Sequence, residues 1–167
     1  MSTRSFSRSI PHPVTLLSVS DGVTENIATM SWVAALSRKP PLLMVSVSPK
    51  RHSHDLMLQA GEFAIIVLTD TRKNLATLAG THSGKESNKW DMEEFKNLKQ
   101  QAKHVKAPVL ENCGVVLECR LVNHVPSGDH TLMIGEVIHI SGESDTPPLI
   151  LSDHKYFKLG SFLEKYP

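Results

Sequence analysis

Short apolar blocks separated by turn residues recur along the chain and predict a structure built mainly of strands. The clearest block is the continuous apolar run Phe63–Leu68, which is typical of a buried strand. Turn residues mark the reversals at Asp21-Gly22, Pro40-Pro41 and Pro126-Ser127-Gly128-Asp129. The pattern predicts strands over Val14–Ser20, Val23–Ala28, Thr29–Leu36, Leu42–Ser48, Phe63–Leu68, Val115–Val125 and His130–Ile140.

Helical spacing is confined to two short stretches. Ser53–Ala60 is one, with Ser53 as the predicted N-cap and Gly61 as the stop. Leu75–Ala79 is the other, and it ends at Gly80. Residues 81–106 are polar and predict an excursion with a helical turn or two around Trp90–Phe95.

Strands that outnumber helices and arrive in hairpins favour an antiparallel closed barrel with one or two peripheral helices. No Gly-x-Gly-x-x-Gly follows a predicted strand, which argues against a Rossmann nucleotide fold. The chain has 167 residues, of which 40% are hydrophobic and 21% charged, so it fits one domain with a sizeable core.

Charge and hydropathy narrow the expected partners. A net charge of +1 gives no basic field for nucleic acid. No apolar run approaches the roughly 20 residues that span a bilayer, so no membrane association is expected. The first ten residues lack the apolar region of a secretory signal. We therefore expect a loosely ordered leader over residues 1–12, a domain over 13–167 and a cytoplasmic location.

The cysteines and histidines predict no metal site. Cys113 and Cys119 are six residues apart, which matches neither a CxxC redox motif nor a zinc knuckle. Both fall in an apparent strand, on one face and too far apart to bond, so buried free thiols are expected. Among nine histidines only His52 and His54 are close in sequence.

Hydroxyl side chains interrupt two of the predicted strands. Because side chains alternate along a strand, Thr29 and Ser31 share one face, and Ser46 and Ser48 share one face of the later strand. If the two strands pair, the hydroxyls form one polar patch suited to a ring edge that alternates donors and acceptors. The alternative is that they are ordinary strand hydroxyls facing solvent.

A basic turn follows the second of these strands. Lys50, Arg51 and Ser53 stand where strand passes into helix, and a helix N-terminus beside cationic side chains is suited to a phosphate. A solvated turn is the alternative. His52 and His54 either line the same site or lie on the surface.

Three further positions are candidates for a ligand site. His130 opens a strand after Gly128-Asp129, where a histidine is more often structural than catalytic. Gly135 lies inside that strand, where a glycine indicates that something approaches closely. Ser83-Gly84-Lys85 is either a plain loop or a flap that touches ligand.

Taken in order, these segments resemble the flavin reductase-like proteins of the FMN-binding split β-barrel, and within them the flavoredoxin-type group. The resemblance runs from about Pro13 to the C-terminal tail and rests on the order and spacing of several segments. They are Asn26-Ile-Ala-Thr-Met-Ser-Trp-Val, Lys39-Pro-Pro-Leu-Leu-Met-Val-Ser-Val, Gly61-Glu-Phe-Ala-Ile, Ser83-Gly84 and Gly128-Asp129-His130. The fold that it implies is mainly β, an antiparallel, Greek-key-like split β-barrel with peripheral short helices.

The resemblance also implies a homodimer that binds one FMN per subunit near the dimer interface. It places His130 near the flavin and the nicotinamide site, which nominates this residue as catalytic. The implied cofactor-binding residues are Thr29, Met30, Ser31 and Trp32 for the ring, Ser46, Val47 and Ser48 on the second strand, Lys50 and Ser53 at the phosphate, and Ser83, Gly84 and Lys89 in the loop.

One loop departs from the family pattern. Relatives often carry Ser-Gly-Arg-Asp-x-Asp-Lys-Phe, whereas this chain has Ser83-Gly-Lys-Glu-Ser-Asn-Lys-Trp. Asn88 stands where the relatives have Asp, and Trp90 where they have Phe. Lys89 is retained. Some relatives also carry a Cys on the second FMN strand, and Val45 to Ser48 offer none.

The implied chemistry is transfer of hydride from NADH or NADPH to FMN, and from there to an acceptor such as free flavin, a ferric complex or a redox partner protein. One alternative is a flavoredoxin, an FMN electron carrier with little NAD(P)H activity of its own. Another is a non-catalytic flavin-binding barrel. No dinucleotide fingerprint in the sequence chooses between NADH and NADPH.

Overall fold

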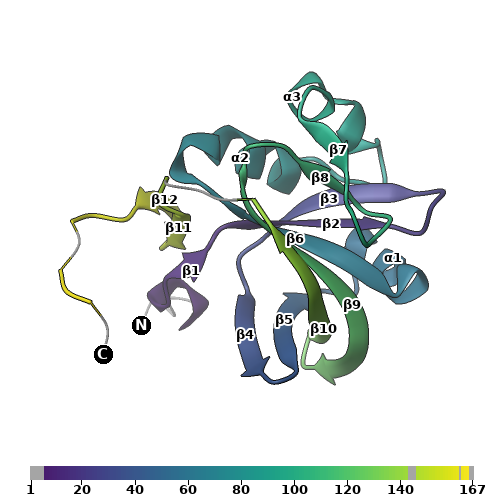
Figure 1. The fold of residues 1–167 in the computed structure, drawn as a ribbon, viewed down its shortest axis with the longest axis horizontal. Helices are drawn as coiled ribbons and strands as arrows, with labels where there is room; N and C mark the ends of the chain where they lie inside the picture. The colour runs from purple at the N-terminus through teal and green to yellow at the C-terminus, as the bar shows by residue number, and fades with distance from the viewer. Residues whose placement is uncertain (1–5, 143–145, 162, 166–167) are drawn as a thin grey trace, which may run out of the picture.

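A single antiparallel sheet of seven strands organises the molecule (Figure 1). The computed structural model describes residues 6–142, 146–161 and 163–165. Within the sheet the strands follow the order β3-β2-β6-β9-β10-β5-β4. Their bounds are β2 Thr15–Ser20, β3 Glu25–Met30, β4 Val33–Arg38, β5 Pro41–Val47, β6 Glu62–Leu68, β9 Gly114–Ser127 and β10 His130–Ser141.

Short helices and two small sheets surround this sheet. Figure 1 shows the helices at its periphery, as predicted. The remaining elements are the helices α1 His52–Ala60, α2 Lys73–Thr81 and α3 Glu93–Lys96, the 3-10 turns η1 Phe6–Ser9, η2 Asp70–Arg72 and η3 Lys89–Asp91, and the strands β1 His12–Pro13, β7 Lys99–Gln101, β8 Pro108–Leu110, β11 Leu149–Ser152 and β12 Lys155–Lys158.

The sheet is apolar on both faces, which explains the continuous apolar run at Phe63–Leu68. Phe63 and Ile65 pack into a cluster closed by α1, while Ala64, Ile66 and Leu68 pack into a second cluster under α2 and the segment after it. A strand covered on both sides needs apolar residues at every position, so the prediction of a buried strand is confirmed.

The mainly β, antiparallel, split-barrel fold with short peripheral helices is confirmed, with one correction. The expectation of a closed barrel is wrong, because β3 and β4 stand at opposite ends of an open strand order. The predicted strand Thr29–Leu36 is also two strands. β3 ends at Met30 and β4 begins at Val33, so Ser31 and Trp32 form the crossing between them.

Two local predictions need correction as well. Helix α1 begins at His52 with the extended Arg51 before it, so Ser53 is inside the helix and is not its N-cap. Cys113 precedes β9, and the two thiols lie in different apolar clusters instead of on one strand face. Both are free and buried, as expected. Burial raises the pKa of the Cys119 thiol to about 12, so it stays protonated at neutral pH.

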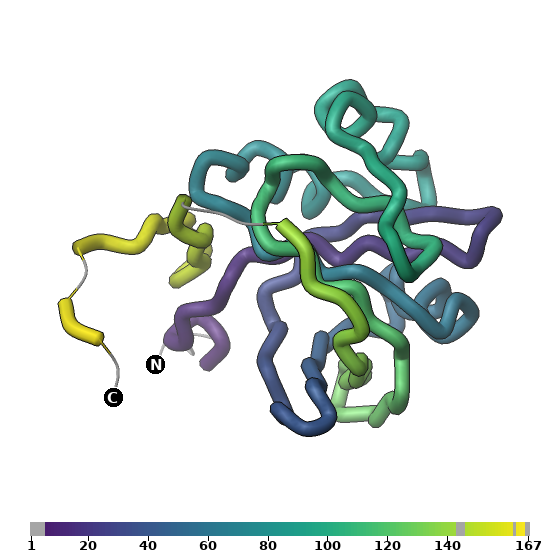
Figure 2. Tube along the Cα trace, in the orientation of Figure 1, coloured from purple at the N-terminus to yellow at the C-terminus, as the bar shows by residue number. Residues whose placement is uncertain are grey.

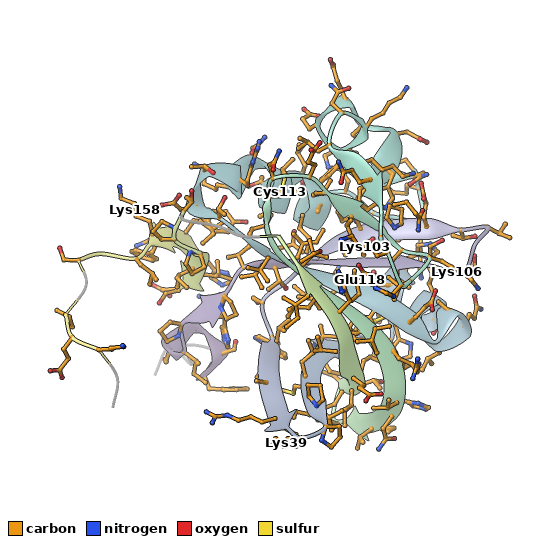
Figure 3. The ribbon with its side chains drawn as sticks, viewed as in Figure 1. Lys39, Lys103, Lys106, Cys113, Glu118 and Lys158 are labelled. Atoms are coloured by element: carbon orange, nitrogen blue, oxygen red, sulfur yellow. The ribbon has the colours of Figure 1, made fainter. Side chains whose placement is uncertain are left out.

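A buried carboxylate holds the loop before β8 against the sheet. Glu118 is 1% exposed and accepts backbone N–H bonds from Lys103, His104 and Val105 at 2.6–3.2 Å. Glu62 accepts a further N–H bond from Lys106 at 2.7 Å. Figure 3 shows Lys103, Lys106 and Glu118 together on this side of the molecule.

Both ends of the described chain lie on one side of the fold, away from the β2–β3 hairpin (Figure 2). There β1 pairs with β11, which pairs with β12. The expected leader, residues 1–12, is described from Phe6 onward, where it forms η1 and the first residue of β1. Its separation from the domain stays a prediction. No helix in the described ranges is long and apolar enough to cross a membrane.

Gly135 lies where a side chain would collide with the core, which is the close approach that its place in a strand predicts. A β-carbon there would stand 2.5 Å from Cζ of Phe63 and 3.0 Å from Cβ of Cys119.

We expect Gly135→Ala to lower the free energy of unfolding by about 1–3 kcal/mol, the usual cost of overpacking a core. Urea unfolding of the purified variant measures this. Gly160→Ala is the matched control, because a β-carbon there meets nothing within 4 Å. Equal stability of the two variants contradicts the packing.

Candidate functional site

One polar cavity lies where β3, the end of β5, the start of α1 and the end of α2 meet. Its volume is about 320 Å³, within the range of roughly 300–1,000 Å³ that small-molecule sites occupy. The residues that line it are Asn26, Ala28, Thr29, Met30, Ser31, Trp32, Ser46, Ser48, Lys50, Arg51, His52, Ser53, Ala79, Gly80, His82, Ser83, Gly84, Lys85, Lys89 and His130.

Every catalytic or cofactor-binding residue predicted from the sequence lines this cavity except Val47, whereas the further candidate Gly135 lies in the core against Phe63. The Val47 side chain is 1% exposed and packs in the core with Val45, so only Ser46 and Ser48 face the cavity from β5. The alternation predicted for this strand is therefore confirmed. It also explains why Val47 presents no side chain to a ligand.

The predicted hydroxyl patch forms, because β4, the second part of the predicted strand Thr29–Leu36, pairs with β5, and the Trp32 carbonyl accepts the Ser46 N–H at 2.9 Å. Ser31 and Thr29 reach the cavity from the β3 end, and Ser46 and Ser48 from β5. The Thr29 hydroxyl already donates a hydrogen bond of 2.5 Å to the Ala76 carbonyl of α2. Thr29 therefore fixes this helix beside the cavity, and the other three hydroxyls are the better candidates for ligand contact.

A buried hydrogen bond pins the start of α1 to β3. The Asn26 amide donates to the Ser53 hydroxyl at 2.7 Å, and Asn26 is 2% exposed. The other end of this amide, Oδ1, has no hydrogen-bond partner among the described residues. Since buried polar atoms are normally paired, this unpaired atom marks the cavity as a place for a polar ligand.

The loop after α2 closes tightly over this end of the cavity. A β-carbon at Gly84 would stand 2.3 Å from Oδ1 of Asn26 and 3.0 Å from Cδ2 of His52. Only glycine lets the backbone come so close. We call residues 82–98 the flap. Gly84 seats it on the cavity, which favours the flap over the plain loop that the sequence left open.

Lys89 brings a buried positive charge to the same end. It is 2% exposed, and its ammonium donates to the Ala79 carbonyl at 3.0 Å. Burial, with the nearby Arg51 as the second cause, lowers the pKa of Lys89 to about 8. The described part of the chain gives Lys89 no carboxylate partner. Lys89, Arg51 and Lys50 therefore form a cationic end that an anionic ligand would neutralise.

His130 and Trp32 form the other end of the cavity. Their rings are 4.8 Å apart at an interplanar angle of 41°, and Nδ1 of His130 lies 2.8 Å from the Asp129 carboxylate. Hydrogen bonding to His130 holds the pKa of Asp129 below its usual value. The carboxylate therefore orients the ring, with Nδ1 engaged and Nε2 directed elsewhere.

The two neighbouring histidines separate. His52 lines the cavity, whereas His54 is 8% exposed and lies in a buried network. Its Nδ1 lies 2.7 Å from the Asp55 carboxylate and its Nε2 2.9 Å from the Thr131 hydroxyl. His54 thereby ties α1 to the strand that carries His130. No group of three or more potential ligands in the described ranges could hold a metal ion.

Several lining residues were not predicted from the sequence as site residues. Asn26 is the most informative, because its burial inside a strand shows only in the folded structure and no local pattern marks it. Ala79, Gly80 and His82 reach the cavity only because α2 packs on β3, and no local pattern marks them.

The comparison with known families agrees with this geometry. The model of the flavin reductase like domain matches residues 6–160. The chain belongs to the flavin reductase-like family. The predicted family membership is therefore confirmed over nearly the whole chain.

Several relatives are named for a reaction. The NADH:riboflavin 5'-phosphate oxidoreductase of Streptomyces pristinaespiralis is 30% identical over 145 residues, which cover 83% of this chain and 76% of the relative.

Solved structures of two kinds share the fold. The NADH:FAD oxidoreductase of Streptomyces globisporus C-1027 superposes with a TM-score of 0.86 at 22% identity, over 95% of this chain and 92% of that one. The flavoredoxin of Desulfovibrio vulgaris (Miyazaki F) superposes with a TM-score of 0.84 at 22% identity, over 99% and 96%. At this identity the likeness concerns the fold alone, and the fold accommodates both a reductase and a flavoredoxin.

The lowered pKa of Lys89 makes a prediction for the protein without ligand. Between pH 8 and 10.5 the unfolded chain keeps the Lys89 proton that the folded chain loses, so the Lys89 contribution to stability rises with pH. Lys89→Met removes this contribution. The free energy of unfolding of Lys89→Met minus that of wild type therefore falls across this window.

Urea unfolding at several pH values measures this difference. Lys96→Met is the control, because Lys96 is exposed on the flap, and its difference from wild type should stay flat. A difference for Lys89→Met that stays flat or rises with pH contradicts the burial of the charge.

Proposed function

We propose that this protein is an FMN-binding, NAD(P)H-dependent flavin reductase that passes electrons to an acceptor. The observation that carries the proposal is the cationic end of the cavity, where Lys89 is buried with no carboxylate partner in the described ranges. A phosphate monoester supplies the missing negative charge. The relative named as an NADH:riboflavin 5'-phosphate oxidoreductase supports FMN as that ester.

The residues present fit a flavin phosphate. Lys89 and Lys50 would hold the phosphate oxygens, and Ser53 lies beside the backbone N–H groups of the first turn of α1. The unpaired Oδ1 of Asn26 lies at this end of the cavity, and the backbone of Gly84 lies close to it. Polar groups are therefore available there to a ligand.

The ring of the flavin would occupy the remaining cavity between the hydroxyl-bearing crossing and β5. Met30, Ser31 and Trp32 would contact it from one strand end, and Ser46 and Ser48 from the other. FMN, when bound, supplies the hydride-accepting chemistry. The lining side chains would hold the ring in place.

His130 is the residue that we assign to the hydride donor. Its ring lies on the cavity wall against Trp32, and Asp129 fixes its orientation. A ring held in this way can bind and orient a nicotinamide beside the flavin position. The cysteines contribute nothing to this chemistry, because both are buried away from the cavity.

Two further parts of the proposal follow from the family resemblance. We propose a homodimer with FMN near its interface, and exposed apolar side chains such as Leu36, Val122 and Val125 are suited to such a contact. We also propose a redox partner protein as one acceptor. The cytoplasmic location stays a prediction.

The phosphate assignment predicts a difference between FMN and riboflavin. Removing the ammonium in Lys89→Met should weaken FMN binding by about 1.5–3 kcal/mol, the usual worth of a hydrogen bond to a charged group. Riboflavin, which has no phosphate, should bind the variant and the wild type alike. Quenching of flavin fluorescence on titration measures both affinities.

Lys96→Met again serves as the matched control and should leave FMN binding unchanged. Equal losses for riboflavin and FMN in Lys89→Met contradict a phosphate contact at Lys89.

The assignment of His130 predicts a kinetic defect without loss of cofactor. We expect His130→Ala to retain FMN while its reduction by NADH or NADPH slows by about 10–100-fold, because the donor is no longer oriented. Anaerobic stopped-flow absorbance of bound FMN measures this step. Exposed His124, whose ring makes no hydrogen bond in the described ranges, provides the control His124→Ala.

An unchanged reduction rate in His130→Ala rejects the role of His130. Wild-type protein that binds FMN but is not reduced by either nucleotide supports the flavoredoxin alternative instead.

A further inference from the structure

Glu25 joins the flap to the wall of the cavity without touching the cavity itself. It is the first residue of β3 and precedes Asn26, whose side chain lies on the cavity. Because side chains alternate along a strand, Glu25 and Asn26 point to opposite sides of β3. A single stretch of strand therefore carries a cavity-lining residue on one side and a charged contact on the other.

The Glu25 carboxylate contacts two residues that are distant from it in the sequence. Its Oε1 accepts a hydrogen bond from Nδ2 of Asn88 at 3.2 Å and is paired with the ammonium of Lys99. Asn88 lies in the flap, and Lys99 is the first residue after it. Glu25 is 22% and Lys99 34% exposed at the side chain, so solvent only partly screens the pair.

Asn88 transmits this contact to the cavity. Its Oδ1 accepts the backbone N–H of Trp90 at 3.1 Å and caps η3, whose first residue is Lys89. Trp90 is 1% exposed and packs edge-on against Phe95, with Lys99 over its ring at 5.4 Å. The position of the Asn88 side chain therefore determines where the buried Lys89 stands.

An amide is needed at position 88 because both of its ends are used. Nδ2 donates to a carboxylate and Oδ1 accepts from a backbone N–H. An Asp there would keep the cap but could not donate to Glu25, and would place a second carboxylate beside it. The pair of Glu25 and Asn88 is thus chemically matched in this chain, at the position where it departs from the family motif.

We propose that Glu25 is a positioning residue for this site and that, through Asn88 and Lys99, it latches the flap closed over the cationic end of the cavity. The latch rests on the proposed function insofar as it serves flavin binding. Its closure of the flap is a property of the protein without ligand, so the two can be tested separately.

Hydrogen exchange of the flap amides, followed by mass spectrometry on the ligand-free protein, tests the latch itself. We expect Asn88→Asp to speed exchange over residues 82–98 by about tenfold, as loss of one hydrogen bond to a charged group would do. FMN titration should show a loss of affinity of similar size. Asn97→Asp adds the same charge to an exposed flap residue and should change neither measurement.

Rescue distinguishes a latch from a general loss of stability. In the double variant Glu25→Gln/Asn88→Asp the new glutamine can donate to the new carboxylate, which restores the contact with its roles exchanged. Because the glutamine at position 25 no longer forms the ion pair with Lys99, we expect flap exchange and FMN affinity to recover from the Asn88→Asp values toward wild type without fully reaching them. Lys99→Met removes the ion pair and the ammonium contact with the Trp90 ring but leaves the Asn88–Glu25 hydrogen bond, and it should open the flap in the same sense.

Four outcomes are decisive. Wild-type exchange of the flap in both Asn88→Asp and Lys99→Met overturns the latch, and so does a double variant no better than Asn88→Asp. Faster flap exchange with unchanged FMN affinity shows that the latch does not contribute to FMN binding. Faster exchange in a protein whose wild type binds no FMN leaves the latch standing and rejects the proposed function alone.

Discussion

The hydrogen bond between Asn26 and Ser53 is the contact on which the arrangement of the site depends. It joins β3 to the first turn of α1 through two buried side chains, 27 residues apart in sequence. The basic residues that precede the helix are thereby brought beside the hydroxyl-bearing end of β3. Gly84 then seats the flap directly on Asn26. A buried polar pair is costly unless it is satisfied, so its presence here specifies one arrangement of three elements.

The proposed function rests on a charge imbalance in this arrangement. Lys89 and Arg51 face the same end of the cavity, and burial lowers the pKa of Lys89 to about 8. Such a site is unfavourable while it is empty, because burying an ammonium without a counter-charge costs stability. A ligand phosphate would supply the counter-charge, so that the buried ammonium would then favour the bound state. The folded chain thus holds part of the binding energy for an anion in its own electrostatics, as functional sites commonly do.

Much of the fold and site could be predicted from the sequence because the relevant signals are local. The apolar run at Phe63–Leu68 and the hairpin before His130 follow from burial and turn chemistry. Alternation along β5 correctly predicts that Ser46 and Ser48 share one face, which lines the cavity, and that Val47 lies on the other face, in the core. A glycine inside a strand predicted a close approach at position 135, although no local pattern identifies Phe63 as the neighbour.

What escaped prediction depends on contacts between distant segments. The break at Ser31 and Trp32 is set by the opening of the barrel between β3 and β4, and no residue pattern in Thr29–Leu36 announces it. Asn26 became a site residue only when α1 folded against it. The roles of Glu25 and Asn88 likewise arise because two residues 63 positions apart in the sequence meet in the fold.

The flavin content of the purified protein tests most directly whether the cavity holds one FMN. Protein freed of excess flavin by gel filtration is denatured, and the released FMN is counted against the chain by absorbance. We predict about one FMN per chain, either as purified or after addition of FMN. A colourless protein that takes up no added FMN contradicts the account.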